Sequence, residues 1–99
     1  NEVQIFVDSK SLLRDGQIAT AWHEHRYRTV TTLAHVKGVK KSVSKAVWNC
    51  ADRTYKVVST VVYDDHGVRL DSAEESPYLR FKSVVPGSLG EVKWNSVCK

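Results

Sequence analysis

The chain has 99 residues, of which 41% are hydrophobic and 26% are charged, with only two prolines and five glycines. This size fits one domain with a single core and excludes a second lobe or a separate cofactor domain. The composition excludes disordered, collagen-like and low-complexity chains. No apolar run approaches the roughly 20 residues that span a bilayer, and no basic-then-apolar signal segment opens the chain. We therefore expect one domain over residues 1–99, from a soluble protein or a processed mature form.

The net charge is +4, and it is unevenly distributed. Between residues 26 and 56, eight basic residues stand against one acid, Asp52, a local balance of +7. Between residues 57 and 79, one basic residue stands against five acids, a balance of −4. Such asymmetry attracts acidic partners through a potential that salt screens within about 8 Å. The alternative is that these charges only keep the surface hydrated.

The two cysteines, Cys50 and Cys98, lie 48 positions apart and form no C-x-x-C motif or zinc-type spacing. A single disulfide is the favoured interpretation, and closing such a loop would stabilise the fold by roughly 4 kcal/mol. That bond would place the protein in an oxidising compartment. The alternative is a cytosolic protein with two buried free thiols.

The first half of the chain alternates between strand and turn patterns. The patterns predict strands, turns and loops in this order: a strand at 3–8, a short turn or single helical turn at 9–14, a hairpin turn at Asp15-Gly16, a strand at 17–27, a long mobile loop at 29–40 and a strand at 42–50. In the second strand, one face carries Ala19, Ala21, His23, His25 and Tyr27.

The second half contains the strongest strand pattern, residues 54–63, which we expect at the centre of the sheet with strict alternation of its two faces. The remaining predicted elements are a turn at 64–67, a strand at 68–72, an acidic loop at 73–77, a strand at 78–84 and a helix after the break at Pro86-Gly87. Ser88 and Glu91 match a capping box, and Trp94, Val97 and Cys98 can share one helix face. This order predicts an α+β fold, an antiparallel sheet of about six strands with a C-terminal helix.

No catalytic motif is present, so we expect no enzyme and no cofactor. A G-x-S-x-G nucleophile setting, a phosphate-binding glycine loop and the EF-hand spacing are all missing. His23 and His25 could share a metal or haem if a third ligand joined them, but a solvated or pH-sensitive pair is favoured. Trp22, Tyr27, Trp48 and Tyr55 flank the basic stretch, but strand aromatics are typical of a core, so nucleic acid is not expected as a partner.

Residues from Ile5 to Cys98 resemble the surface-adhesin protein E family. The resemblance is carried by several blocks: Phe6-Val7-Asp8, Ser11-Leu12, Arg14-Asp15-Gly16, Trp22, Lys41-Ser42-Val43, Asn49-Cys50, Arg53-Thr54-Tyr55, Tyr63, Gly67, Val85-Pro86-Gly87-Ser88 and Cys98. It implies an exported protein of Gram-negative bacteria, at the outer-membrane surface or in the periplasm, whose helix is tied to an antiparallel sheet by a Cys50–Cys98 disulfide. It also implies adhesion to host matrix or serum proteins such as vitronectin and laminin. Attachment to a membrane would need a lipid anchor that these residues do not carry.

The sequence therefore predicts a binding protein whose contact region is the basic segment between residues 26 and 45. Its proposed ligand-binding residues are Arg26, Arg28, Lys37, Lys40, Lys41 and Lys45. The expected partner is a host matrix or serum protein, or an acidic glycan, and free edge strands would allow a homodimer. The alternative function is a periplasmic envelope protein or enzyme inhibitor with no host ligand.

Overall fold

The computed structural model describes residues 2–75 and 80–99. Within these residues, one antiparallel sheet of seven strands is joined to one α-helix and one short 3-10 helix. In chain order the elements are β1 (Val3–Val7), η1 (Ser9–Ser11), β2 (Leu13–Asp15), β3 (Ile18–Leu33), β4 (Val36–Asn49), β5 (Thr54–Tyr63), β6 (Arg69–Glu74), β7 (Lys82–Ser83) and α1 (Leu89–Cys98). The predicted fold class is confirmed.

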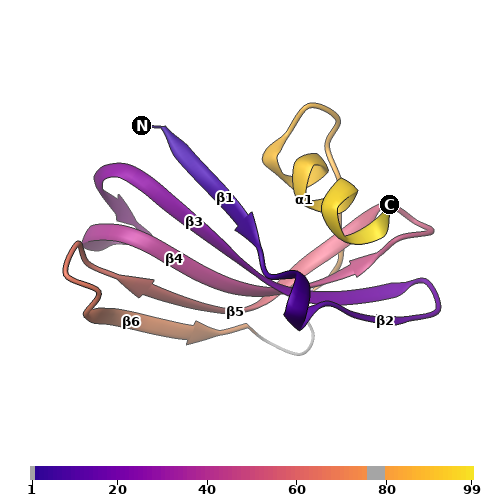
Figure 1. The fold of residues 1–99 in the computed structure, drawn as a ribbon, viewed down its shortest axis with the longest axis horizontal. Helices are drawn as coiled ribbons and strands as arrows, with labels where there is room; N and C mark the ends of the chain where they lie inside the picture. The colour runs from indigo at the N-terminus through magenta and orange to yellow at the C-terminus, as the bar shows by residue number, and fades with distance from the viewer. Residues whose placement is uncertain (1, 76–79) are drawn as a thin grey trace.

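The main sheet has the strand order β1-β3-β4-β5-β6, with β2 added to the first residues of β3 and β7 to the first residues of β5. Figure 1 shows α1 lying over one side of this sheet, towards the end that carries β2 and the C-terminus. The central strand of this order is β4, which has two strands on either side, and β5 lies one position further along. The prediction that residues 54–63 form the central strand was therefore wrong by one position.

The long mobile loop predicted for residues 29–40 is wrong, because this segment forms the outer half of the β3–β4 hairpin. Leu33 pairs with Val36, and the strands are joined by a two-residue turn at Ala34 and His35. The β-branched run from Thr29 to Thr32 favours extended backbone. The turn escaped prediction because it contains neither glycine nor asparagine, although both φ angles are positive, 48° and 68°.

A bulge interrupts the strict alternation that we expected along β5. The pairing with β4 shifts at Lys45–Ala46, where Lys45 faces Ser59 and Ala46 faces Val57. The extra residue, Val58, changes which side chains point towards α1. Tyr55 and Val57 therefore share a face with residues of the opposite parity further along the strand, Thr60 and Val62.

The region around β6 and β7 differs from its predicted boundaries. Ala73 and Glu74, predicted as part of an acidic loop, belong to β6. Of the strand predicted at 78–84, only Lys82 and Ser83 are extended and paired within the described residues. Positions 76–79, which include the end of the predicted loop and the start of that strand, lie outside the described residues.

The core lies between α1 and the end of the sheet nearest to it. It is a cluster of small and aromatic side chains: Ala19, Ala21, Ala46, Trp48, Val84, Trp94 and Val97. The alanines of β3 and β4 leave room for the two tryptophans, and Trp48 stacks on Tyr55 with ring centroids 4.8 Å apart. The expectation that Trp94 and Val97 share the packed face of the helix is confirmed.

Helix α1 begins at the predicted N-cap, Ser88, but the Glu91 carboxylate returns to the amide of Gly87 and not to that of Ser88. Ser88 Oγ accepts a hydrogen bond from the Glu91 amide at 3.3 Å, and Glu91 Oε1 accepts one from the Gly87 amide at 3.2 Å. At the other end of the helix, Cys98 is bonded to Cys50, so the predicted disulfide is confirmed. The last helical residue is thereby tied to the end of β4.

Candidate functional site

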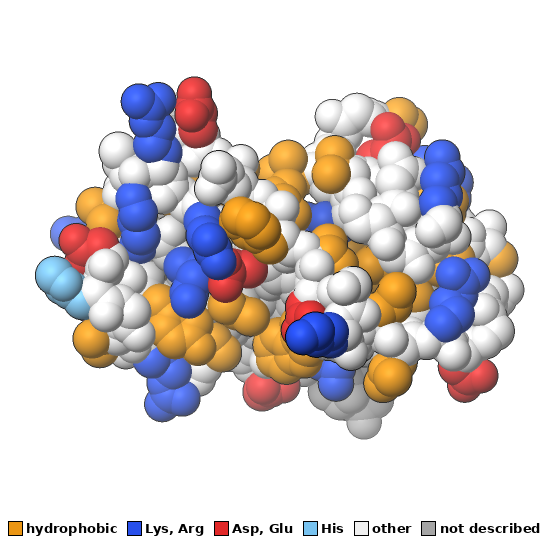
Figure 2. All heavy atoms as spheres, in the orientation of Figure 1, with side chains coloured by type: hydrophobic (Ala, Val, Ile, Leu, Met, Phe, Trp, Pro, Cys, Tyr) orange, Lys and Arg blue, Asp and Glu red, His pale blue; other side chains and the backbone are white. Residues whose placement is uncertain are grey.

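The six predicted ligand-binding residues all lie on the β3–β4 hairpin, but they do not form one cluster. Register places Arg26 opposite Lys41, and Lys45 opposite Trp22, on the face of the sheet turned away from α1. Arg28, Lys37 and Lys40 lie further towards the hairpin tip. Figure 2 shows Lys and Arg side chains gathered at this end of the molecule, with acidic side chains among them.

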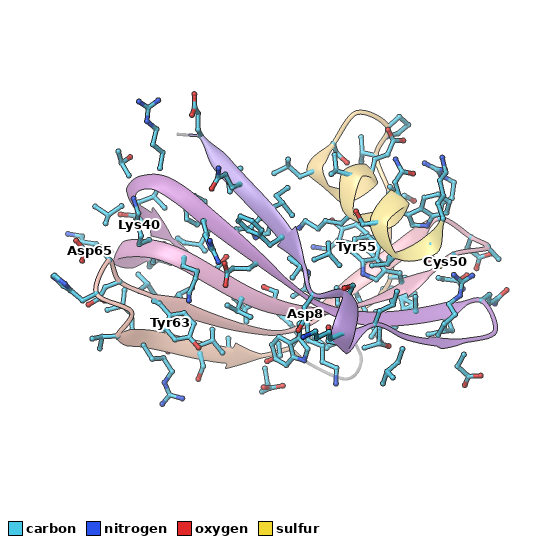
Figure 3. The ribbon with its side chains drawn as sticks, viewed as in Figure 1. Asp8, Lys40, Cys50, Tyr55, Tyr63 and Asp65 are labelled. Atoms are coloured by element: carbon cyan, nitrogen blue, oxygen red, sulfur yellow. A yellow bond between two sulfur atoms is a disulfide. The ribbon has the colours of Figure 1, made fainter. Side chains whose placement is uncertain are left out.

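Several of these charges are already engaged within the protein. Glu24 pairs with both Arg26 and Lys41, the latter at 3.8 Å. Arg28 pairs with Glu2 at 3.5 Å, and the Lys40 ammonium donates to the Arg28 carbonyl. The local charge is therefore lower than the +7 counted along the chain. Asp65, in the turn after β5, also lies at the same end of the sheet as Lys40 (Figure 3).

Two of the cations lie over aromatic rings on the face turned away from α1. The Arg26 guanidinium is 4.3 Å from the centre of the Phe6 ring, and the Lys41 ammonium is 4.8 Å from the centre of the Tyr63 ring. Across four adjacent strands, β1, β3, β4 and β5, two neighbouring cations therefore lie between two aromatic side chains. Cations held in this way keep their stems ordered while their charged heads remain open to a partner.

The opposite face of the sheet carries a cavity of about 490 Å³ between β3, β6 and α1. Its floor is formed by β4 and β5, where Ser42, Ser44 and Thr60 supply hydroxyl groups between Val57 and Val62. Ser44 Oγ and Thr60 Oγ1 are hydrogen-bonded to each other at 2.9 Å. A volume of this size is typical of sites for small organic molecules.

Three basic side chains share one end of this cavity. His23 is almost completely buried, and its Nε2 lies 3.3 Å from Lys93 Nζ of α1. His25 lies next to it, with ring centroids 5.1 Å apart, and contacts Ser42 Oγ through Nδ1 at 3.4 Å. Burial, together with the nearby charge of Lys93, lowers the pKa of His23 to about 3 and that of His25 to about 4. Both imidazoles are therefore neutral at pH 7.

Lys93 is the cation that these two neutral rings surround. Burial lowers its pKa from 10.5 to about 8, so the ammonium form still predominates at pH 7. It donates to His23 and forms no ion pair within residues 2–75 and 80–99. The role of Lys93 is not visible in the sequence, because it lies 70 positions from His23. Ser42 and Ser44 share a strand face with the core residues Ala46 and Trp48. Hydroxyl groups on a face that otherwise packs the core could have indicated a polar site there.

The histidine pair does not gain a metal-binding partner from the described part of the chain. No group of three or more His, Cys, Asp or Glu residues there is close enough to hold a metal ion. The partner that His23 does have is Lys93, whose ammonium occupies the position next to Nε2.

The motif residues that carry the family resemblance position α1. Asn49 Oδ1 accepts hydrogen bonds from the amides of Ala51 and Asp52, which closes the turn after β4. Arg53 pairs with Glu91 at 3.0 Å, and its guanidinium lies 4.3 Å from the centre of the Trp94 ring. Tyr55 lies under Gly90, where an added Cβ would be 3.6 Å from the tyrosine ring. These residues thus act in folding and locate no ligand site.

The family model of surface-adhesin protein E matches residues 1–99. The chain belongs to this family. The crystal structure of protein E from non-typeable Haemophilus influenzae has a similar fold, with a TM-score of 0.63 and 20% sequence identity. The match covers 97% of this chain and 69% of that chain, and at this identity it shows the fold alone. No curated protein matches the sequence.

Membership of the surface-adhesin protein E family confirms the resemblance and gives the class of function. A surface adhesin is exported, exposed at the cell surface, and acts by binding rather than by catalysis. No helix within residues 2–75 and 80–99 has the length and apolar character needed to cross a membrane.

Proposed function

We propose that this chain captures host matrix or serum proteins of the vitronectin or laminin type through the basic β3–β4 hairpin. The observation that supports the proposal most directly is that all six candidate residues lie on one hairpin, with Arg28, Lys37 and Lys40 towards its tip. The face turned away from α1 adds ordered cations and exposed apolar surface, because Arg26 lies over Phe6, which is 43% exposed. Acidic segments of a partner would be attracted to this surface.

The contact region that we propose extends from the Arg26–Lys41 pair towards the hairpin tip. In the inner part, Glu24 neutralises part of the charge. Lys37 and Lys40 make no ion pair with the described acidic residues, so they contribute the net positive charge. We therefore expect binding to depend on these tip lysines more than on Arg26.

The test is binding of the purified protein to immobilised vitronectin and laminin across a salt series. We predict saturable binding that weakens as salt rises, because the attraction between exposed charges is screened. The triple variant Lys37→Glu/Lys40→Glu/Lys41→Glu should bind about tenfold more weakly or worse at low salt, since it places like charges opposite an acidic partner.

The matched control is Lys10→Glu/Lys82→Glu/Lys99→Glu, which makes the same change in net charge away from the hairpin. If both triple variants lose affinity equally, the effect is one of net charge and the hairpin is not the contact region. Lys41→Glu would place a second carboxylate next to Glu24, so circular dichroism must show that the triple variant is folded. Gln at all three positions removes the positive charges without adding negative ones.

The same assay separates the alternatives. Competition by a sulfated glycan that removes all binding would make an acidic glycan the partner in place of a host protein. No binding at any salt concentration, together with protection from protease on whole cells, would favour a periplasmic envelope protein or inhibitor and contradict the proposal.

A further inference from the structure

The cavity between the sheet and α1 is separate from the basic face and has its own chemistry. It lies on the opposite side of β3 and β4, where His23, His25 and Lys93 meet. Nothing in the adhesin proposal uses these side chains. Lys93 is half-buried and has no carboxylate partner within the described residues, so the partial desolvation of its charge is not offset by an ion pair.

The side chains around Lys93 provide no negative charge to balance its ammonium group. His23 and His25 are both neutral at pH 7, so His23 can accept a hydrogen bond from the ammonium but offers no counter-charge. An ammonium has three N–H donors, and only the bond to His23 is formed within the described residues. The remaining donors are available to an acceptor that enters the cavity.

The rest of the cavity is suited to an apolar body. Val57 and Val62 of the floor and Leu33 and Val36 of the hairpin line it. The acidic residues that line it, Asp71 and Glu75, lie on the β6 side. Strands β3 and β6 are separated by β4 and β5, so the β6 side lies three strand spacings, roughly 14 Å, from the β3 strand that carries His23 and His25. The two carboxylates would repel an anion at the wrong end and so favour one orientation.

We propose that this cavity binds a small aliphatic carboxylate, with its head group paired to Lys93 and its hydrocarbon chain along the valine floor. The carboxylate would accept the free N–H donors of Lys93, and the Ser42 and Ser44 hydroxyl groups lie at the same rows of the sheet as His25 and His23. The chain would cover Val57, Leu33 and Val36, which are only half-buried. Charge-assisted hydrogen bonds and apolar burial then act together.

The experiment uses sodium octanoate as the probe and isothermal titration calorimetry as the measurement. The expected result is saturable binding at pH 7, with octanol and octylamine as matched probes that share the chain but lack the negative charge. Both should bind at least about tenfold more weakly, the value of one hydrogen bond to a charged group. Equal binding of all three probes would show a generic apolar groove and overturn the proposal, as would no binding of octanoate.

Variants test the assignment of Lys93. Lys93→Gln should weaken octanoate binding about 10- to 100-fold, Lys93→Arg should keep most of it, and Lys10→Gln is the control for loss of one positive charge elsewhere. Because Lys93→Gln could disturb α1, its circular dichroism is recorded, and Ala73→Trp provides a second variant that fills the cavity from β6. Unchanged affinity in folded Lys93→Gln would overturn the proposal.

The pH dependence provides an independent readout. The titratable and charged groups that line the cavity are His23, His25 and Tyr27 from β3, Asp71 and Glu75 from the β6 side, and Lys93 itself. The two histidines are neutral throughout the range above pH 7. Octanoate binding should therefore weaken as pH rises through the Lys93 pKa of about 8, and the Lys93→Arg variant should remove that dependence between pH 7 and about pH 9.5. An affinity that does not change over this range in the parent protein would contradict a role for the Lys93 charge.

Discussion

At the scale of single residues, the most unusual feature is the basic cluster of His23, His25 and Lys93. All three pKa values are lowered, with burial as the main cause. When the pKa of a group is lower in the folded protein than in the unfolded chain, the free energy of unfolding decreases as pH falls, because the unfolded chain binds the proton more readily. For the histidines, this places the loss on the acid side of neutrality.

His23 should make the protein sensitive to mild acid. Its pKa is 6.5 in the unfolded chain and about 3 in the fold, so the contribution of the neutral ring is complete above pH 6.5 and is lost as pH falls towards 3. Linkage gives a loss on the order of 2 kcal/mol in the free energy of unfolding between pH 7 and pH 5. Urea denaturation at a series of pH values measures it.

The matched variants are His23→Gln and His66→Gln, the second at an imidazole that is 82% exposed. His23→Gln should reduce the slope of the stability profile between pH 7 and pH 5 by about half, because His25, whose pKa falls from 6.5 to about 4, contributes a similar loss. His66→Gln should leave the slope unchanged. Equal slopes in the parent and His23→Gln would show that His23 is not the responsible group.

At the scale of elements, turns that contain glycine were predictable from the sequence, and the turn that lacks it was not. Asp15-Gly16 and Pro86-Gly87 were recognised because glycine accepts a positive φ, which the structure shows at Gly16 and Gly87. The Ala34–His35 turn was missed for the opposite reason, and with it the outer half of the longest hairpin. The bulge at Val58 was not visible either, because no glycine or proline marks it.

The features of the candidate site also fall into those that the sequence indicates and those that it does not. Basic residues close together in the sequence were recognisable, and the hairpin does place Arg26 opposite Lys41. The contacts that neutralise them, such as Glu24 with Lys41, and the approach of Lys93 to His23 depend on pairings between separate elements. Composition and periodicity along one strand do not contain such information.

The Ala34–His35 turn predicts where the hairpin can be stabilised. Residues other than glycine cost about 1 kcal/mol or more in the left-handed region, and a two-residue hairpin turn with both φ angles positive favours Asn-Gly. Ala34→Asn/His35→Gly should therefore raise the free energy of unfolding by about 1 kcal/mol. Chemical denaturation measures the change, and the reverse experiment, Gly16→Ala at φ 60°, should lower it. No gain from the Asn-Gly turn would mean that the outer hairpin does not unfold together with the core.

At the scale of the whole molecule, the fold depends on holding one ten-residue helix against a sheet that extends well beyond it. The contacts that hold α1 are concentrated at one end: the Trp94 and Val97 packing, the Arg53–Glu91 pair and the Cys50–Cys98 bond. Because α1 also supplies Lys93, the proposed cavity exists only while the helix is in place. Stability and the proposed ligand site are therefore linked through the same few contacts.

Removing the disulfide tests this dependence. In the loop-entropy model, a bond between residues 48 positions apart contributes about 4 kcal/mol, so Cys50→Ala/Cys98→Ala should lower Tm by about 15 °C or more. Thermal denaturation followed by circular dichroism measures Tm, and amide hydrogen exchange compares α1 with β3 and β4. Since the alanines remove the tether but leave the strand pairing intact, exchange should increase first in the helix. A small drop in Tm with equal protection of helix and sheet would show that the Trp94 and Val97 packing and the Arg53–Glu91 pair hold α1 without the disulfide, and that the cavity does not depend on the bond.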